Sequence, residues 1–274
     1  MSEQPTVDKV AAFRALHVPG NPLLMPNPWD AGTAKLLASL GFQALATTSS
    51  GHAGTLGLPD GSIDKTAALQ HAAALVEAVD LPISADLENG FADEPDAVHA
   101  CVTAAAATGL AGCSIEDYSS GASPGIYDRG LAAGRIAAAV RAARDSTGLV
   151  VTARAENHIR GNPDLGDTIA RLQAYQEAGA DVLYAPGLVE LDDIRRVAAA
   201  VDQPVNVLIR PGMATVAELA DTGVARISVG GAFSLAAFGA VSRASRELLE
   251  HGTYGFLDLT AEGSTQAAAA FPPR

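Results

Sequence analysis

The stretch that decides the fold is ISADLENGF, Ile83–Phe91. It begins as a short apolar run of the kind that forms a buried strand, and it then places Asp86 and Glu88 two residues apart, followed by Asn89 and Gly90. In a barrel of parallel strands, the chemistry lies at the carboxyl ends of the strands. If the chain forms such a barrel, further strands that end in polar residues are expected along the sequence.

Short apolar runs recur along the whole chain and alternate with helical patterns. Stretches such as TAALQHAAALVEAV (66–79) and GDTIARLQAYQEAG (166–179) carry apolar residues at i, i+3 and i+4. Several of these stretches end in glycine, as a helix stop signal should, at Gly41, Gly109, Gly179 and Gly223. The apolar runs predict eight strands at Leu23–Pro26, Ala44–Thr48, Pro82–Asp86, Gly112–Glu116, Leu149–Arg154, Asp181–Ala185, Val205–Ile209 and Arg226–Val229.

Continuous apolar strands that alternate with helices indicate a parallel sheet covered on both faces. Eight such units favour an α/β fold of the (β/α)8 TIM barrel type over an open, doubly wound sheet, which stays the alternative. No GxGxxG follows the first predicted strand, and this weakens the dinucleotide-binding form of that alternative.

Length and composition narrow the class of protein. The chain has 274 residues with 48% hydrophobic content, which suits a single domain spanning residues 1–274. Its formal net charge of -13 argues against a nucleic-acid or anionic-membrane partner. The N-terminus has no apolar signal region, and no apolar run approaches the roughly 18 residues of a membrane span, so we expect a cytoplasmic protein.

Two smaller features carry expectations of their own. Cys101 and Cys113 lie among small apolar residues, and we expect two reduced core thiols. The tail STQAAAAFPPR (264–274) follows the last helical pattern, and it is expected to be frayed or packed on a neighbouring subunit as a C-terminal extension.

Acidic side chains gather at two neighbouring strand ends. Asp86 and Glu88 follow the third predicted strand, Glu116 and Asp117 follow the fourth, and Asp60 lies in a loop that can fold over the same mouth. Carboxylates that converge in a partly dry pocket repel one another, and a hard divalent cation relieves that repulsion. Oxygen ligands favour Mg²⁺, or Mn²⁺, over zinc. Asp117 points to the other face by strand alternation, so a structural role suits it better.

Other polar residues surround the same mouth. Arg154 ends the fifth strand and is predicted to lie on the far side of the mouth from the acids, where it pairs with Glu156 or another acid, or grips a bound carboxylate. Ser50 and Gly51 either cradle an oxyanion or form a simple turn, and His52 either touches a ligand or is a solvated loop histidine. The pair Gly230-Gly231 either binds phosphate or permits close packing of strand and helix.

Several motifs together resemble the isocitrate lyase and phosphoenolpyruvate mutase superfamily. They run in order through nearly the whole chain: PNPWDAGTAKLLASLGFQALATTSSG (26–51), ADLENGF (85–91), SIEDY (114–118), TARAENH (152–158), AGADVLYAPG (178–187) and RISVGGAF (226–233). The resemblance implies a (β/α)8 barrel whose last helix is exchanged between paired subunits, usually in a homotetramer built as a dimer of dimers. It also implies Mg²⁺ and a small 2-oxo or 2-hydroxy carboxylate substrate.

Each candidate site residue has a role that this resemblance implies. The metal-binding residues would be Asp86, Glu88, Glu116 and Asp60, with Glu88 replacing the aspartate that is usual at the second position. The substrate-binding residues would be Ser50, Gly51, His52 and Arg154, and the catalytic residues would be Asp60 and Arg154.

The loop after SIEDY departs from the superfamily pattern. The isocitrate and methylisocitrate lyases carry a Lys-Lys/Arg-Cys-Gly-His signature there, and the phosphonate enzymes carry a lysine and an asparagine. This chain has SSGASPGIYDRG (119–130), in which Ser119, Ser120, Ser123 and Tyr127 are the polar candidates, and Cys113 faces away from that loop. Without either set of loop residues, the sequence retains only the chemistry that both groups of enzymes share, in which a metal ion and oxyanion donors stabilise an enolate of the substrate.

The sequence therefore predicts a magnesium-dependent lyase or hydrolase that makes or breaks a C–C bond next to a 2-oxo or 2-hydroxy carboxylate, with oxaloacetate-like or methylisocitrate-like acids as substrates. Two alternatives stay open. One is C–P bond chemistry on phosphonopyruvate-like substrates, and the other is a barrel that binds a 2-oxo acid without turning it over.

Overall fold

The computed structural model describes residues 8–119, 121 and 125–271 and contains one eight-stranded parallel sheet. The strand order is β1-β8-β7-β6-β5-β4-β3-β2, so each strand from β2 to β8 pairs with its neighbour in that part of the chain, and β1 pairs with β8. The strands are β1 (Leu23–Met25), β2 (Leu45–Ala46), β3 (Ile83–Asp86), β4 (Gly112–Glu116), β5 (Val150–Arg154), β6 (Val182–Tyr184), β7 (Val205–Leu208) and β8 (Arg226–Ser228).

One further hydrogen bond closes the sheet. The Ala46 N–H donates to the Pro26 carbonyl oxygen at 3.1 Å, which joins β2 to the end of β1. The sheet is thus a barrel, and the predicted (β/α)8 fold is confirmed, while the open doubly wound alternative is wrong. All eight predicted strands are present with bounds that agree to within two residues.

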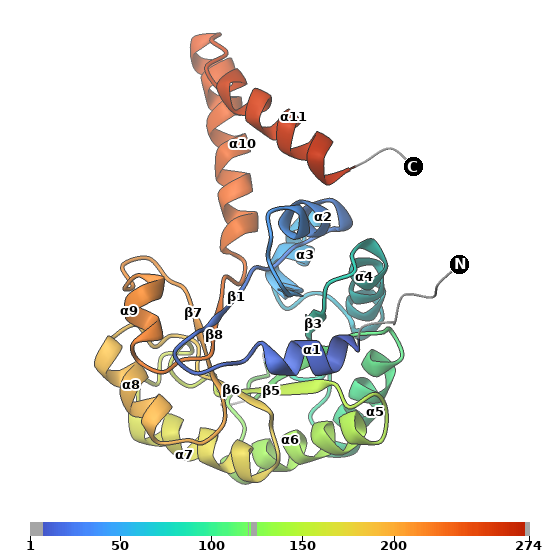
Figure 1. Cartoon of the computed structure of the whole chain (residues 1–274), viewed down its shortest axis with the longest axis vertical. Helices are drawn as coiled ribbons and strands as arrows, with labels where there is room; N and C mark the ends of the chain where they lie inside the picture. Colours follow the sequence, from blue (N-terminus) through green and yellow to red (C-terminus); the bar gives the residue numbers. More distant parts are fainter. Residues whose placement is uncertain (1–7, 120, 122–124, 272–274) are drawn as a thin grey trace.

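Helices surround the barrel and connect its strands (Figure 1). Their bounds are α1 (Lys9–Ala15), α2 (Ala31–Ser39), α3 (Ser49–Thr55), α4 (Lys65–Ala78), α5 (Pro95–Ala106), α6 (Arg129–Arg144), α7 (Leu165–Glu177), α8 (Leu191–Ala199), α9 (Val216–Ala220), α10 (Ala232–His251) and α11 (Leu257–Ala270). Acidic N-caps fix where several begin, as when the Asp64 carboxylate accepts the Ala67 N–H at 2.9 Å. The predicted stop at Gly179 is a left-handed residue with φ 96°.

The helix α1 covers the N-terminal end of the barrel. Phe13 on this helix is fully buried and packs with the first residues of β1, β5 and β6. A Cβ at Gly112, the first residue of β4, would lie 2.7 Å from the Phe13 ring, so glycine is needed for this close approach. Because α1 covers this end, ligands have access to the barrel from the carboxyl ends of the strands.

The core lies between the sheet and the helices, and it contains both cysteines. Cys101 and Cys113 are buried and free, as predicted. Burial raises the pKa of the Cys113 thiol, which keeps it protonated.

The C-terminal segment forms an arm rather than a frayed tail. The helix α10 extends away from the barrel, and α11 folds back along it toward α2 (Figure 1). The predicted tail is therefore helical as far as Ala270, and residues 272–274 lie outside the described part of the chain. Within the described ranges, no helix has the length and apolar character needed to cross a membrane.

Candidate active site

The polar residues that end β3, β4 and β5 meet at the mouth of the barrel. In the strand register, Asp86 of β3 lies beside Ser114, and Glu116 of β4 lies beside Arg154 of β5. Each of the three strands is an apolar run that ends in a charged residue, so the sheet alignment alone brings the three charges together. This confirms that the acids share one edge of the barrel.

Arg154 lies among the acids and not across the mouth from them, so its predicted position was wrong. Its Nη1 lies 3.2 Å from Asp86 Oδ1, and its Nη2 lies 3.2 Å from Glu116 Oε2 and 2.7 Å from Glu156 Oε1. Register explains this position, because β4 and β5 pair so that Glu116 and Arg154 are neighbours. Three carboxylates around one guanidinium leave an excess of negative charge, and they raise the pKa of Arg154 further above its ordinary value despite its burial.

Glu88 is the most strained residue of the site. Its backbone has φ 48°, a left-handed conformation that costs a non-glycine residue roughly 1–2 kcal/mol. Its Oε1 is buried and has no hydrogen-bond partner among the described residues. Burial raises the pKa of Glu88 to about 7, with further contributions from the Asp86 and Asp60 carboxylates. An unpartnered carboxylate held by a strained backbone is a feature of functional sites.

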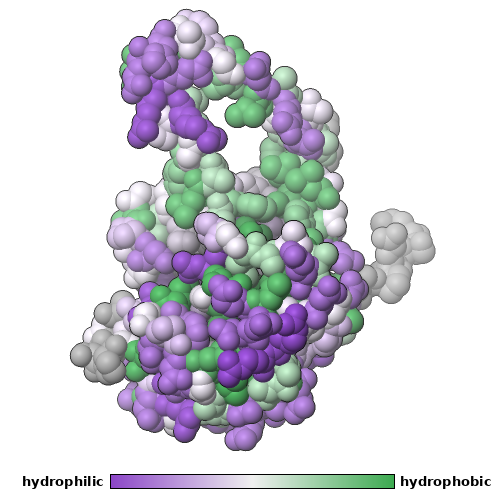
Figure 2. All heavy atoms as spheres, turned by 90° about the vertical axis from the view of Figure 1, so that its left-hand side faces the viewer, coloured by the Kyte–Doolittle hydropathy of each residue, from purple (hydrophilic) through white to green (hydrophobic). Residues whose placement is uncertain are grey.

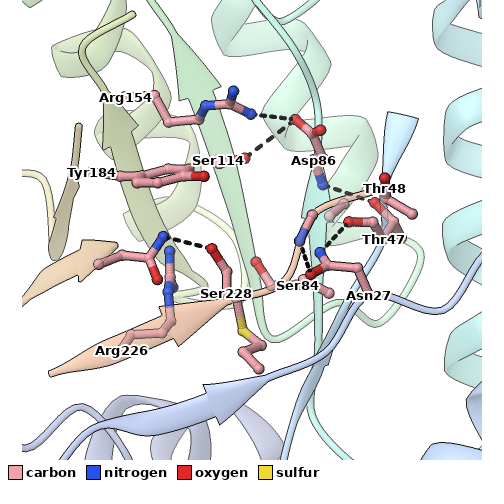
Figure 3. Close-up of a pocket in the computed structure, with 15 residues that line it drawn as sticks. Asn27, Thr47, Thr48, Ser84, Asp86, Ser114, Arg154, Tyr184, Arg226 and Ser228 are labelled. Carbon is pink, nitrogen blue, oxygen red and sulfur yellow. Dashed lines mark hydrogen bonds and ion pairs between the residues drawn. The ribbon is translucent and has the colours of Figure 1, made fainter. Parts of the chain in front are cut away.

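An open pocket of about 340 Å³ lies above these residues. Asp60, on the loop after α3, is exposed and forms part of its wall, so the structure brings this predicted residue to the same mouth. The other residues of the wall are Ser49, Gly61, Glu88, Asn89, Glu116, Tyr118, Ser119, Arg154 and Arg160. A second, smaller cavity of about 60 Å³ lies inside the barrel and shares Arg154 with this upper pocket (Figure 3).

The predicted oxyanion segment is a helix and not a loop. Ser50, Gly51 and His52 belong to α3, whose N-cap Thr48 accepts the Gly51 N–H at 3.2 Å. That amide is therefore already bonded within the chain. The hydroxyl that reaches the acids is that of Ser49, which donates to Asp86 Oδ2 at 3.0 Å.

His52 faces another histidine. Its ring stacks on the His71 ring with 3.9 Å between centroids, and the His71 Nε2 contacts the Trp29 carbonyl oxygen at 3.0 Å. A small cavity beside this pair also has Asp86 and Glu88 in its wall. His52 is thus close to the acidic residues, but it is not the solvated loop histidine of the alternative prediction.

Two further predictions about single residues can be compared with the structure. Asp117 does turn away from the mouth, because its carboxylate accepts hydrogen bonds from the Glu156 N–H at 2.8 Å and from Arg171 Nη1 at 3.0 Å. The Gly230 N–H donates to Asn27 Oδ1 at 2.7 Å, and a Cβ at Gly231 would lie 2.5 Å from Ser50 Oγ. These contacts favour the packing interpretation of the two glycines over phosphate binding.

The loop after β4 is described only in part. Ser119 belongs to the wall of the upper pocket, whereas Ser120 and Ser123 lie outside the described residues. The Tyr127 hydroxyl is engaged elsewhere, because it donates to Asp93 and accepts from Asn89 Nδ2 at 3.0 Å.

Sequence reasoning missed two residues of the mouth. Arg160 contacts Glu156 Oε2 through Nε at 3.0 Å, and its guanidinium lies 3.7 Å from the centre of the Tyr118 ring. Tyr184 ends β6 and lies under the Arg154 guanidinium, 5.1 Å from it. Tyr184 could have been predicted, because it lies at the end of a strand. Arg160 could not, because it lies in a loop whose sequence has no periodic pattern that would indicate where its side chain points.

A metal would have to enter a site that Arg154 now occupies. Among the residues that the structure describes, no three His, Cys, Asp or Glu side chains converge on one point. Asp86 and Glu116 turn toward Arg154, while the Glu88 Oε1 stays unpartnered. The donor set is nonetheless of the kind that Mg²⁺ prefers, because it consists of carboxylate oxygens with no thiolate or imidazole among them.

Comparison with known proteins gives the family. The model of the phosphoenolpyruvate phosphomutase family matches residues 13–249, and the chain belongs to that family. It is 32% identical to the 2-methylisocitrate lyase of Escherichia coli (strain K12) over 71% of this chain and 67% of the enzyme. Members of this superfamily are lyases and mutases, so enzyme status follows at the level of the superfamily.

Solved structures agree with this assignment. A protein of Burkholderia cenocepacia J2315, provisionally assigned as a lyase/mutase, superposes with a TM-score of 0.93 at 49% identity, over 98% of this chain and 97% of that one. A phosphonopyruvate hydrolase, in complex with oxalate and Mg²⁺, has a TM-score of 0.80 at 24% identity over 96% and 98% of the two chains. The latter shares the fold.

Proposed function

We propose that the protein is a magnesium-dependent lyase or hydrolase that makes or breaks a C–C bond next to the carboxylate of a small 2-oxo or 2-hydroxy di- or tricarboxylate. The observation that carries the proposal is the group of Asp86, Glu88 and Glu116 at one strand edge, where the Glu88 Oε1 is buried and has no hydrogen-bond partner among the described residues. A buried carboxylate without a partner is costly, and a bound cation would offset that cost.

Asp86, Glu88, Glu116 and Asp60 are the residues that would hold Mg²⁺, with Mn²⁺ as the second choice. When bound, the ion would stabilise negative charge on a substrate oxygen as a Lewis acid. The chain also supplies a positive charge of its own, because Arg154 Nη1 lies 3.2 Å from Asp86 Oδ1 and orients that carboxylate.

Two arginines suit a substrate with more than one carboxylate. Arg154 and Arg160 both belong to the wall of the upper pocket, whose volume of about 340 Å³ suits a small acid. The planar guanidinium of Arg154 can grip a carboxylate at two points once it is released from Asp86. Arg160 stacks on Tyr118, which fixes its side chain for a second carboxylate.

A second candidate function is C–P bond chemistry on phosphonopyruvate-like substrates. It is favoured by one observation, namely that the family model that matches the chain is that of phosphoenolpyruvate phosphomutase. The geometry of the mouth serves both reactions, because each develops an enolate beside a carboxylate.

The test is a binding and turnover panel with and without Mg²⁺. Oxalate, pyruvate, oxaloacetate, methylisocitrate and phosphonopyruvate are each added to the purified protein, and melting temperature and product formation are recorded. We expect stabilisation that needs Mg²⁺ and the acid together, and turnover of a C–C substrate. Turnover of phosphonopyruvate alone selects the second candidate, and saturable binding of the acids without turnover selects a non-catalytic binding barrel.

Two variants make the panel specific. Asp86→Asn should remove the magnesium-dependent part of the stabilisation and at least roughly 100-fold of any turnover. Asp96→Asn, at an exposed position in the first turn of α5, is the matched control and should leave both unchanged. Full magnesium response in Asp86→Asn would remove the proposed metal centre.

A further inference from the structure

The barrel interior holds an arginine with no acidic partner. Arg226, the first residue of β8, is 2% exposed. Its Nη1 lies 3.1 Å from His17 Nε2, and its Nη2 donates to Thr152 Oγ1 at 3.1 Å. Among the ion pairs formed by the described residues, none includes Arg226. In this respect it differs from Arg154, which contacts three carboxylates.

The hydrogen-bonding capacity of Arg226 is only partly used. A guanidinium has five N–H donors, and the two contacts above use one hydrogen of each terminal nitrogen. The Nε is buried and has no partner among the described residues. Three donor hydrogens of a buried cation are thus left for another acceptor.

Two titratable side chains near Arg226 are neutral, and a third, Arg154, is a cation. His17 Nδ1 lies 2.9 Å from the Phe13 carbonyl oxygen, so it is the nitrogen that carries the hydrogen and Nε2 accepts from Arg226. Burial and Arg226 lower the pKa of His17 to about 3, so the ring carries no charge at neutral pH. Burial raises the pKa of Tyr184 to about 12, which keeps its hydroxyl protonated. Neither residue balances the positive charge.

Burying an unpaired charge costs several kcal/mol, and a group in that position commonly gives up its charge instead. Burial does lower the pKa of Arg226, to about 10, but the side chain still remains protonated at neutral pH. A counter-charge at this place would therefore stabilise the folded protein.

The lower cavity supplies space for such a counter-charge. Its volume is about 60 Å³, whereas roughly 10–15 Å³ suffices for one water molecule. Arg226 forms part of its wall together with Asn206, Ser228, Ser84 and Tyr184. The Asn206 Nδ2 donates to the Ser228 hydroxyl at 3.0 Å, and that hydroxyl donates to the Val207 carbonyl oxygen at 3.2 Å.

One carboxylate belongs to the same wall, and it is paired with Arg154. Asp86 lies 3.2 Å from Arg154 Nη1. Figure 3 shows this pair on one side of the Tyr184 ring and Arg226 on the other. The part of the cavity near Arg226 is thus lined by a cation, hydroxyls and an amide.

We propose that the lower cavity binds one small anion beside Arg226, below the mouth of the barrel. Two sources have this chemistry: an inorganic anion of halide size taken from solution, or one carboxylate of an acid that enters the barrel. The first source does not depend on the proposed function, whereas the second rests on it.

The inorganic anion is tested by thermal unfolding at constant ionic strength. Bromide or chloride replaces gluconate, an anion too large for the cavity, and the melting temperature is followed as a function of halide concentration. We expect a saturable rise in the wild type. In Arg226→Met the apparent dissociation constant should rise roughly tenfold or more, because a hydrogen-bonded charge is lost. Arg129→Met removes an exposed arginine from α6 and should respond like the wild type.

Arg226→Met is expected to fold, because removal of an uncompensated buried charge is often neutral or stabilising. Should it fail to fold, Arg226→Lys, which keeps the charge, and bromide anomalous diffraction from wild-type crystals decide the question. An anomalous peak inside the barrel beside Arg226 supports the proposal.

The carboxylate source is tested with oxalate and Mg²⁺ in halide-free buffer. Stabilisation by oxalate that competes with bromide and is weakened by Arg226→Met assigns the cavity to the acid. Stabilisation by oxalate that is additive with bromide and insensitive to Arg226→Met assigns the cavity to the inorganic anion. The proposal is overturned if neither anion gives an Arg226-dependent response and no bromide lies in the cavity, whatever the outcome of the substrate panel.

Discussion

At the scale of single residues, two carboxylates that are adjacent in the chain have different roles, because their side chains lie on opposite faces of the strand. Asp117 points into the barrel wall and has a complete set of partners: the Glu156 N–H, Arg171 and the Tyr175 hydroxyl at 2.5 Å. Glu116, one residue earlier, points to the mouth and contacts Arg154. Strand alternation sorts these two acids, and the sequence contained that information.

The partners of Asp117 make its removal costly. Asp117→Ala leaves the buried Tyr175 hydroxyl and the Glu156 N–H without their acceptor, and it removes one of the two carboxylates that pair with Arg171. We therefore expect a loss of about 3–5 kcal/mol in the free energy of unfolding. Tyr175→Phe removes a single hydrogen bond and should cost about 1–3 kcal/mol. Urea denaturation measures both. A loss below about 0.5 kcal/mol in Asp117→Ala, the range of exposed substitutions, would contradict this account.

His17 predicts an acid-sensitive stability. Its pKa is lowered to about 3 in the folded protein by burial and by Arg226, whereas an unfolded histidine has a pKa of 6.5. The contribution of His17 is therefore fully present above pH 6.5 and is lost as the pH falls toward 3, with a slope that approaches 1.4 kcal/mol per pH unit.

Replacing the histidine should flatten that slope. His17→Gln keeps an acceptor for Arg226 but does not titrate, so its free energy of unfolding should fall less steeply between pH 6 and pH 4 than that of the wild type. Urea denaturation at several pH values gives both slopes. The half-buried His99 on α5 supplies the control, because it does not contact Arg226 and His99→Gln should keep the wild-type slope. Equal slopes in His17→Gln and the wild type would show that His17 is not held neutral.

At the scale of elements, the sequence predicted the positions of the strands better than the register in which neighbouring strands pair. Apolar runs bounded by polar residues identified the eight strands and the acids that end them, because burial on both faces imposes that pattern. Register was not readable, so Arg154 was placed across the mouth although β4 and β5 align it with Glu116.

Other parts of the site escaped prediction for a related reason. The segment SSGHAGT forms α3 because Thr48 caps it and Ser234 and Trp29 pack against Gly51, which are contacts between residues distant in the chain. Composition alone indicated a turn. Arg226 likewise could not be predicted as an unpaired buried cation, because one inward-facing residue in a short strand has no sequence signature.

The packing of α3 against α10 gives a prediction about elements. A Cβ at Gly231 would lie 2.5 Å from Ser50 Oγ, so Gly231→Ala should push α3 and Ser49 away from Asp86 and weaken binding of a 2-oxo acid several-fold. Gly239→Ala, in the middle of α10 with nothing within 4 Å, should instead stabilise the protein by about 0.5–1 kcal/mol. Thermal unfolding with and without ligand separates the two effects. Unchanged ligand affinity in Gly231→Ala would argue against a link between this packing and the mouth.

At the scale of the whole molecule, the arm formed by α10 and α11 carries large apolar side chains that the barrel does not cover. Leu249 is 84% exposed, Leu235 67% and Val241 65%. Figure 2 shows apolar surface on the arm and at its base. Isolated exposed apolar residues are ordinary, but a row of them along one projecting element marks a contact surface. This agrees with the exchange of the last helix between subunits that the superfamily resemblance implies.

The arm therefore predicts a homo-oligomer, a dimer of dimers by resemblance to the superfamily. Light scattering coupled to size-exclusion chromatography should give the mass of four chains for the wild type at micromolar concentration. Val241→Glu places a charge in the apolar surface of α10 and should shift the mass toward a smaller species while the barrel stays folded, as circular dichroism can verify. Val216→Glu, the same change at an exposed position of α9 on the barrel, should leave the mass unchanged.

Because α10 packs on α3 near the mouth, dissociation of the oligomer should also weaken ligand binding. A wild type that elutes as a monomer would remove the contact surface and leave the apolar arm without a partner.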